Sequence, residues 1–244
     1  MTGRVVLVTG GSRGIGLACA RRFQALGDRV AVTSRHAAPA DVVDEPPGRP
    51  ALVPVVCDVT DPAQVDAAFG HVEEALGPVE ILVANAGITR DMLLLRMKEE
   101  DWAAVIDTDL TGVYRTVRRA LGPMVRAHRG RIVIVSSVVG FLGSAGQVNY
   151  AAAKAGLVGL ARSLAREVGS RGITVNVVAP GMVDTDMIAT LGEQRVEQLR
   201  SMVPLGRAAT PDEVAGAVVF LSSDDATYVT GAVLPVDGGL AMGL

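Results

Sequence analysis

The sequence predicts an α/β protein that folds as one doubly wound domain, with a parallel seven-stranded sheet flanked by helices on both faces. Three observations point to this class. Continuous runs of Val, Ile and Leu alternate with longer helical stretches, which is typical of parallel strands buried on both faces. The chain has neither an internal repeat nor an interdomain linker. Its 244 residues suit one large core, so we expect a single domain over residues 1–244.

Seven apolar runs are expected to form the strands, at Val5–Thr9, Arg29–Thr33, Leu52–Cys57, Ile81–Ala84, Ile132–Ser136, Thr174–Val178 and Val233–Val236. Helical periodicity predicts five helices between them, at Gly14–Leu26, Pro62–Leu76, Asp101–His128, Tyr150–Ser170 and Pro211–Ser222. The segment His36–Pro50, rich in Ala, Pro and Asp, is expected to form a loop or one turn at most. Ligands of such a sheet bind beyond the carboxyl ends of its strands.

The amino-acid composition disfavours several classes of protein. The chain is 49% hydrophobic and 20% charged, with a net charge of −3. This mildly acidic balance argues against nucleic acid as a partner and against a basic membrane-binding face. No apolar run reaches the ~18 residues that span a bilayer, and the first strand begins too early for a signal peptide. Cys19 and Cys57 have no metal-binding or redox spacing, so we expect a reduced cytoplasmic protein without a metal.

A glycine-rich turn follows the first strand. It reads Thr9-Gly-Gly-Ser-Arg-Gly-Ile-Gly16 and leads into the first helix. Glycines at 10, 14 and 16 allow a tight turn and bring backbone N–H groups close to a pyrophosphate. A glycine cluster alone could be an ordinary turn, but its position between strand and helix favours a dinucleotide site.

The end of the second strand selects the cofactor. An NAD site would place an acid there for the ribose hydroxyls, whereas this chain has Arg35, and Arg13 lies in the glycine loop. Two guanidinium groups suit a ribose 2′-phosphate, so NADPH/NADP+ is the expected cofactor. The alternative is a pair of solvated surface arginines.

Two further strand ends carry polar residues whose roles stay open. Asp58, after the third strand, could accept a hydrogen bond from the adenine amine or could cap the following turn. The triplet Asn85-Ala86-Gly87 follows the fourth strand. Its small residues would allow a ligand to approach closely, and Asn85 could tie neighbouring strand ends together, but an ordinary turn would read the same way.

Candidate catalytic residues lie between Ser137 and Lys154. Tyr150 and Lys154 are four residues apart in a helical stretch, so their side chains leave the same face. A free tyrosine titrates near ~10, and a nearby ammonium would lower that pKa and make the phenol a usable general acid or base. Ser137, at a strand end, could hydrogen-bond the oxygen that Tyr150 protonates. A helix that merely carries Tyr and Lys is the alternative, since this pattern is weak by itself.

The scarcity of lysine strengthens this assignment. The chain contains 21 Arg and only two Lys, Lys98 and Lys154. Where only positive charge is needed, this composition supplies Arg. A lysine is a compact ammonium whose pKa can shift, and Arg does not replace it at such a site.

These motifs together resemble the short-chain dehydrogenase/reductase family from end to end. The matching residues, in the same order and spacing, are Thr9-Gly10-x-x-x-Gly14-x-Gly16, Asn85-Ala86-Gly87, Ser137, Tyr150-x-x-x-Lys154 and Pro180-Gly181. Within that family the chain is most similar to bacterial 3-oxoacyl-[acyl-carrier-protein] reductases of the actinobacterial and mycobacterial branch. The resemblance implies a Rossmann-type fold and NADPH-dependent reduction of a β-keto thioester to the (3R)-hydroxy thioester by a homotetramer.

The resemblance also implies roles for particular residues. Ser137 would hold the substrate carbonyl, Tyr150 would donate the proton, and Lys154 would assist Tyr150 and bind the nicotinamide ribose. Met187–Pro204, within residues 186–206, would form a mobile lid over the acyl chain, although an ordinary surface helix fits equally well. The implied cofactor-binding residues are Gly10, Ser12, Arg13, Gly14, Ile15, Gly16, Arg35, Asp58, Val59, Asn85, Ala86, Gly87, Tyr150, Lys154, Pro180, Gly181, Val183 and Thr185.

One position departs from the family pattern. The fourth catalytic residue of the family is an Asn that holds a water, and this chain has Asp109 there. The carboxylate could pair with Lys154 and compete with the phenolate for the ammonium. We therefore expect activity with an altered pH profile. A weakly active subunit that assembles with an active relative is the alternative.

The expected macromolecular partner is an acyl carrier protein bearing a 3-oxoacyl chain. The resemblance implies docking beside the active-site mouth through basic residues, here Arg129 and Arg171, although both could equally be solvated. The apolar tail Leu234–Leu244 suggests a buried subunit interface. Fatty-acid synthesis is the first expected pathway, and secondary-metabolite polyketide or polyene synthesis is the alternative. An NAD-linked alcohol or steroid dehydrogenase is disfavoured because the acid at the second strand is missing.

Overall fold

One seven-stranded parallel sheet organises the computed structural model, which describes residues 3–36, 51–186 and 192–242. The strand order is β3-β2-β1-β4-β5-β6-β7, and every neighbouring pair is parallel. The strands are β1 (Val5–Val8), β2 (Arg29–Ser34), β3 (Val53–Val56), β4 (Ile81–Ala84), β5 (Gly130–Val135), β6 (Ile173–Pro180) and β7 (Val233–Val236). The predicted fold class is confirmed. The strand order reverses on either side of β1, which is the place where such sheets bind ligands.

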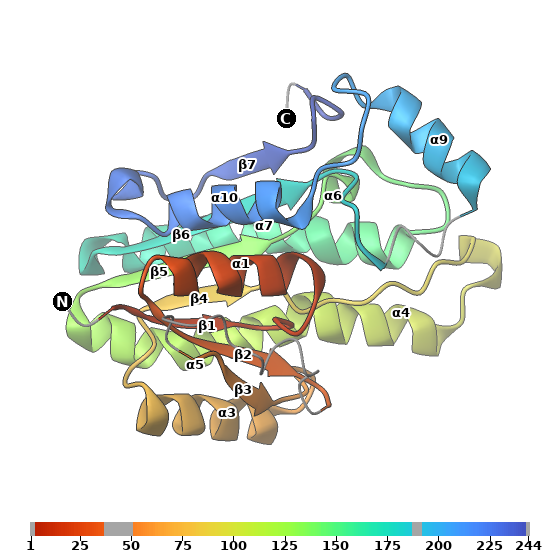
Figure 1. The fold of residues 1–244 in the computed structure, drawn as a ribbon. Helices are drawn as coiled ribbons and strands as arrows, with labels where there is room; N and C mark the ends of the chain where they lie inside the picture. The colour runs from red at the N-terminus through yellow and green to blue at the C-terminus, as the bar shows by residue number, and fades with distance from the viewer. Residues whose placement is uncertain (1–2, 37–50, 187–191, 243–244) are drawn as a thin grey trace.

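Helices cover both faces of the sheet (Figure 1). On one face, α1 (Gly14–Ala25) packs against α10 (Pro211–Leu221), around a core that includes Cys19 and Phe23. On the other, α3 (Pro62–Ala75), α5 (Gly112–Ala127) and α7 (Val148–Val168) enclose a second core with Phe69 and Leu157. Shorter elements are α4 (Glu99–Ile106), α6 (Val139–Leu142), α9 (Glu193–Met202), the 3₁₀ turns Leu94–Arg96, Gly169–Arg171 and Asp224–Ala226, and a π-helical turn at Asp107–Thr111.

The helix expected over Asp101–His128 is interrupted. It begins earlier, as α4, passes through the π-helical turn Asp107–Thr111, and continues as α5 until His128 adopts a left-handed conformation with φ 52°. Gly112 at the junction packs closely on Val59, since a Cβ there would lie 2.7 Å from a Val59 methyl group. The extra residue of a π-helical turn alters which side chains point inward, and such turns often occur at functional sites.

Two expectations fall wholly or partly outside the described residues. Of the expected loop His36–Pro50, only His36 is described, and 187–191 of the expected lid are likewise not described. In the remaining part of that segment, α9 leads into a turn in which the Leu205 N–H donates to the Gly238 carbonyl. Among the described residues, no helix is long and apolar enough to cross a membrane.

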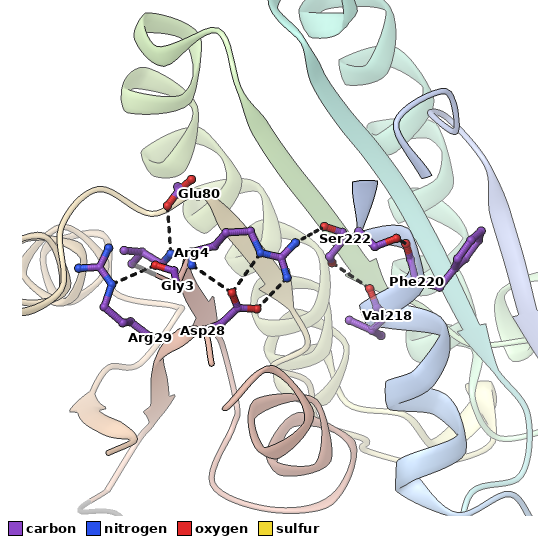
Figure 2. A network of polar contacts seen from close by, with 10 residues as sticks. Gly3, Arg4, Asp28, Arg29, Glu80, Val218, Phe220 and Ser222 are labelled. Carbon is purple, nitrogen blue, oxygen red and sulfur yellow. Dashed lines mark hydrogen bonds and ion pairs between the residues drawn. The ribbon is translucent and has the colours of Figure 1, made fainter. Parts of the chain in front are cut away.

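Arg4 connects three elements at the amino end of the sheet (Figure 2). Its guanidinium donates to both carboxylate oxygens of Asp28, at 3.1 and 2.7 Å, and to the Ser222 carbonyl at 2.8 Å. Its backbone N–H also donates to Asp28. The Asp28 side chain is 5% exposed, so this carboxylate depends on Arg4 for its interactions.

Replacing Asp28 with Asn is expected to destabilise the protein by roughly 2–3 kcal/mol, because the partly buried Arg4 guanidinium loses the buried carboxylate that accepts its hydrogen bonds. Urea unfolding would measure the loss. A matched control is Glu197→Gln, which removes the exposed ion pair between Glu197 and Arg200 and should cost under about 1 kcal/mol. Equal losses of unfolding free energy in the two variants would contradict a stabilising role for the Arg4–Asp28 interaction.

Candidate active site

A cavity of about 710 Å³ opens at the carboxyl ends of the strands. This size is typical of a small-molecule or cofactor site. The cavity wall includes all four predicted catalytic residues and every predicted cofactor residue except Gly16. The cavity is also lined by residues that the sequence did not indicate as site residues: Thr33, Ser34, His36, Cys57, Ile88, Thr108, Val135, Ser136, Asp184, Asp186 and Pro211. Most of them are sequence neighbours of predicted residues.

The glycine loop forms one end of the cavity and requires glycine for two different reasons. Gly10 and Gly14 have positive φ angles of 64° and 54°, where other residues are strained. Gly16 is required for space, because its Cβ would overlap the Gly10 carbonyl oxygen and lie 2.6 Å from the Asn85 amide nitrogen. No side chain caps the N-terminus of α1. Its first N–H groups are therefore available to an anion such as a pyrophosphate.

Asn85 ties the ends of β1 and β4 together. Its side-chain amide donates to the carbonyls of Thr9 and Gly10, at 3.0 and 3.1 Å. The backbone N–H groups of Asn85 and Ala86 both donate to the Thr9 hydroxyl. Of the two interpretations left open for Asn85, the geometry favours the strand tie. Thr9 is an equal partner in it, and only its place at the start of the glycine motif could have indicated this.

Asp58 caps the turn that follows it, which is one of the two roles left open for this residue. Its Oδ1 accepts hydrogen bonds from the Thr60 N–H and hydroxyl, at 2.9 and 2.7 Å. The cap of α3 is Asp61, which accepts from the N–H groups of Ala63 and Gln64. Asp58 and Val59 line the cavity, and contact with the adenine stays a prediction.

The two arginines expected at the ribose phosphate lie on the rim. Arg35 is exposed just after β2, and no acid occupies the end of that strand. Arg13 forms an ion pair with Asp186 at 2.9 Å, in which both side chains are 76% exposed. A pair this exposed is weak, so Arg13 can exchange Asp186 for another anion at low cost.

The segment after β6 closes the opposite side of the cavity. Gly181 packs against Asp237, where a Cβ would lie 2.8 Å from the Asp237 Cα. Val183 bridges to Ala209, and the Thr185 hydroxyl donates to the Val183 carbonyl. This bracing places Val183 and Thr185 in the cavity wall, and their contact with the cofactor stays a prediction.

Tyr150, Lys154 and Asp109 are neighbours in the cavity wall and form a group that we call the row. Lys154 is 3% exposed, and its Nζ lies 5.3 Å from the centre of the Tyr150 ring. The same Nζ donates to the Val135 carbonyl at 3.2 Å and lies 3.2 Å from Asp109 Oδ2. Ser137 follows β5, and its hydroxyl accepts from the Val139 N–H. The structure therefore brings together the four residues that the sequence indicated as catalytic.

Asp109 enters this row from the π-helical turn and is fully buried. Its Oδ1 accepts a hydrogen bond from the Ile88 N–H at 2.8 Å. Gly87 leaves room for it, because a Cβ at that position would lie 2.8 Å from Asp109 Oδ2 and 3.4 Å from Lys154 Nζ. The glycine at position 87 thus allows the Asp109 carboxylate and the Lys154 ammonium to lie close to the backbone of the Asn85-Ala86-Gly87 triplet.

The electrostatics of the row differ from the simple expectation. Burial raises the pKa of Tyr150 above its usual range; the Lys154 ammonium opposes this rise, whereas the Asp109 carboxylate adds to it. Burial acts to lower the pKa of Lys154, but Asp109 and Tyr150 outweigh it and the pKa is raised. The expected lowering of the Tyr150 pKa by Lys154 is therefore outweighed in this chain.

Arg129 and Arg171 lie away from the cavity. Arg129 directly precedes β5, and Arg171 lies two residues before β6, so both are at the amino end of the sheet. The nearest acid to Arg129 is Glu80, at 4.0 Å, and Arg171 lies 3.4 Å from the His128 ring. Neither residue lines this chain's own pocket, and docking of a carrier protein through them stays a prediction.

Comparison with known proteins places this site in a family. The family model described as enoyl-(acyl carrier protein) reductase matches residues 10–241. The chain belongs to this family, within the short-chain dehydrogenase/reductases.

Curated relatives match nearly the whole chain. It is 51% identical to the 3-oxoacyl-[acyl-carrier-protein] reductase MabA of Mycobacterium tuberculosis (strain ATCC 25618 / H37Rv), over 98% of this chain and 94% of the relative. Identity to MabA of Mycobacterium avium is 50%, over 98% and 91%. Identity to the 3-oxoacyl-[acyl-carrier-protein] reductase FabG of Escherichia coli (strain K12) is 46%, over 98% of both chains.

Proposed function

We propose that this protein reduces 3-oxoacyl thioesters carried by acyl carrier protein to (3R)-hydroxyacyl thioesters, using NADPH, in fatty-acid synthesis. The observation that carries the proposal is the row of Tyr150, Lys154 and Asp109 in one cavity with the glycine loop. The names of the relatives, 3-oxoacyl-[acyl-carrier-protein] reductases, support the substrate class. A single domain working as a cytoplasmic homotetramer completes the proposal.

The residues suggest how the reaction proceeds. The bound cofactor would supply a hydride to the substrate carbonyl carbon. Ser137 would hold the carbonyl oxygen through its hydroxyl, and Tyr150 would donate its phenolic proton to that oxygen as negative charge develops there. Lys154, held by the Val135 carbonyl and Asp109, would stabilise the resulting phenolate.

The cavity is suited to a dinucleotide. The uncapped N-terminus of α1 and the left-handed glycines provide an anion cradle, and Arg13 and Arg35 supply positive charge at the rim. A 2′-phosphate would draw Arg13 away from Asp186, because a doubly charged phosphate offers more acceptor oxygens than a carboxylate.

Replacing Arg35 with Ala is expected to raise the KM for NADPH roughly 10- to 100-fold, the loss of one charge-assisted hydrogen bond. The KM for NADH should change little. Steady-state kinetics with both cofactors would measure this, with exposed Arg126→Ala, at the end of α5, as the control. Equal increases for NADPH and NADH would indicate damage to the loop rather than loss of a phosphate contact.

The substrate assignment is tested by NADPH oxidation with an acetoacetyl thioester. Turnover is expected, together with little reduction of a crotonyl thioester, which lacks the 3-oxo group. Bound NADPH with neither substrate reduced would overturn the proposal. Preference for crotonyl thioester would indicate an enoyl reductase, the activity in the description of the family model.

Two alternative functions would use the same cavity and the same residues. The enzyme could serve a secondary-metabolite pathway on polyketide or polyene intermediates, which chain-length and substrate preference would reveal. Asp109 favours a second possibility, a weakly active cofactor-binding subunit, because its carboxylate competes for Lys154. A slow parent that becomes fast on mixing with an active relative would support that role.

Docking of the acidic carrier protein is proposed at Arg129 and Arg171. Both lie at the amino end of the sheet, whereas this chain's cavity lies at the carboxyl end. A carrier bound there would have to serve the cavity of a neighbouring subunit. The docking proposal therefore depends on the oligomer.

A further inference from the structure

The charge balance of the row Tyr150–Lys154–Asp109 has a functional consequence. Asp109 is fully buried yet lines the cavity. Its Oδ1 is satisfied by the Ile88 N–H, whereas Oδ2 has no aligned hydrogen-bond donor among the described residues and faces the Lys154 ammonium at 3.2 Å. A buried carboxylate in this position depends on Lys154 for its stabilisation.

Lys154 is therefore shared between two acids. Its Nζ donates to the Val135 carbonyl, lies 3.2 Å from Asp109 Oδ2 and is 5.3 Å from the centre of the Tyr150 ring. Ionisation of Tyr150 would place a second negative charge beside a single ammonium. Because Asp109 and Lys154 are buried, that like-charge repulsion is screened less than it would be at the surface. The phenol is favoured over the phenolate as long as Asp109 is ionised.

Two other groups among the described residues also act on Tyr150. Asp91, in the loop after β4, also raises the pKa of Tyr150, as the smallest contribution, and the Ser137 hydroxyl lowers it. On the π-helical turn itself, Asp107 forms an ion pair with Arg115 of α5 at 2.8 Å. Asp109 is thus the principal acid that opposes the effect of Lys154 on Tyr150.

We propose that Asp109 is a positioning residue that keeps Tyr150 in its proton-donating form, and that its carboxylate, held against Lys154, extends reduction to more alkaline pH. This inference rests on the proposed reductase function for its catalytic meaning. Its physical basis, the effect of one buried carboxylate on one phenol, does not depend on the substrate.

The direct test is a pH titration of phenolate absorbance on the protein without added cofactor. The chain has three tyrosines, and subtraction of the Tyr150→Phe variant isolates the Tyr150 component. In Asp109→Asn the midpoint of that component is expected to fall by about one pH unit or more, since the opposing negative charge is gone. Asp107→Asn is the matched control. It removes a carboxylate from the same turn that does not contact Lys154, and its midpoint should match the parent.

A kinetic readout accompanies the titration. The alkaline limb of kcat/KM for NADPH-dependent reduction of an acetoacetyl thioester should shift downward in Asp109→Asn by the same amount as the phenolate midpoint. A merely structural role for Asp109 would lower activity without moving this limb. If Asp109→Asn fails to fold, Asp109→Ser removes the same charge with a smaller side chain, and the same shift is expected.

The outcomes separate the two proposals. A midpoint that is unchanged in both neutral variants, or no Tyr150 phenolate in any protein before alkaline unfolding, would overturn the role of Asp109. A shifted midpoint with no turnover in any variant would uphold that role and refute the proposed reductase activity. Turnover without any shift of the midpoint would support the reductase activity and refute the role of Asp109.

Discussion

Tyr150→Phe is expected to reduce turnover of an acetoacetyl thioester by about 10²–10⁴-fold, the usual contribution of general acid catalysis. The substitution removes only the phenolic oxygen. Tyr150 and Ser137 both line the cavity, and the centre of the Tyr150 ring lies 5.3 Å from Lys154 Nζ. No other described tyrosine lines the cavity. Steady-state kinetics would measure the loss in kcat.

Two comparisons make this result specific. NADPH binding by fluorescence titration should persist in Tyr150→Phe, because the glycine cradle and Arg35 are untouched. Tyr228→Phe, at a fully exposed tyrosine outside the cavity, should retain parental turnover. Activity within a few-fold of the parent in Tyr150→Phe would show that another group donates the proton.

Gly16→Ala is expected to weaken NADPH binding more than 100-fold or to prevent stable folding. The added Cβ would overlap the Gly10 carbonyl oxygen and crowd the Asn85 amide that ties β1 to β4. Backbone atoms cannot yield as a flexible side chain can, so the loop has to move by a large fraction of an ångström. Loop movement of this kind displaces the N–H groups that face the phosphates.

Gly70→Ala is the matched control, because it makes the same change of glycine to alanine at a position with free space. Gly70 is exposed within α3, and a Cβ there would meet nothing within 4 Å. The substitution should raise the free energy of unfolding by up to about 1 kcal/mol through helix propensity, with unchanged NADPH binding. Calorimetry would measure NADPH binding by both variants, and urea unfolding would measure their stability. Normal NADPH binding by a folded Gly16→Ala variant would contradict the close packing of the loop.

The sequence predicts this fold well because its strands are buried on both faces. Continuous apolar runs such as Val5–Thr9 mark such strands directly, and the structure places β1 at Val5–Val8. The glycine loop, Ser137, Tyr150 and Lys154 meet in one cavity because each follows a strand or begins a helix at the same edge of the sheet. Their positions are therefore fixed by topology once the strands are known.

Features that depend on three-dimensional detail could not be predicted. The hydrophobic periodicity runs through Asp107–Thr111 without a break, so it hides the π-helical turn that directs Asp109 inward. The ion pair between Arg13 and Asp186 joins residues 173 positions apart. The effect of Lys154 on Tyr150 has the expected sign, but the competing desolvation depends on burial that periodicity does not measure.

The near absence of lysine has a practical consequence for chemical modification. Lys98 is exposed at the start of α4, whereas the Lys154 side chain is 4% exposed inside the cavity. Of the two lysines, an amine-selective reagent would therefore modify Lys98 and leave Lys154 largely unmodified. The folded protein can thus carry a dye or a surface attachment at very few defined positions. Slow additional labelling at Lys154 would report how often the cavity opens to the reagent.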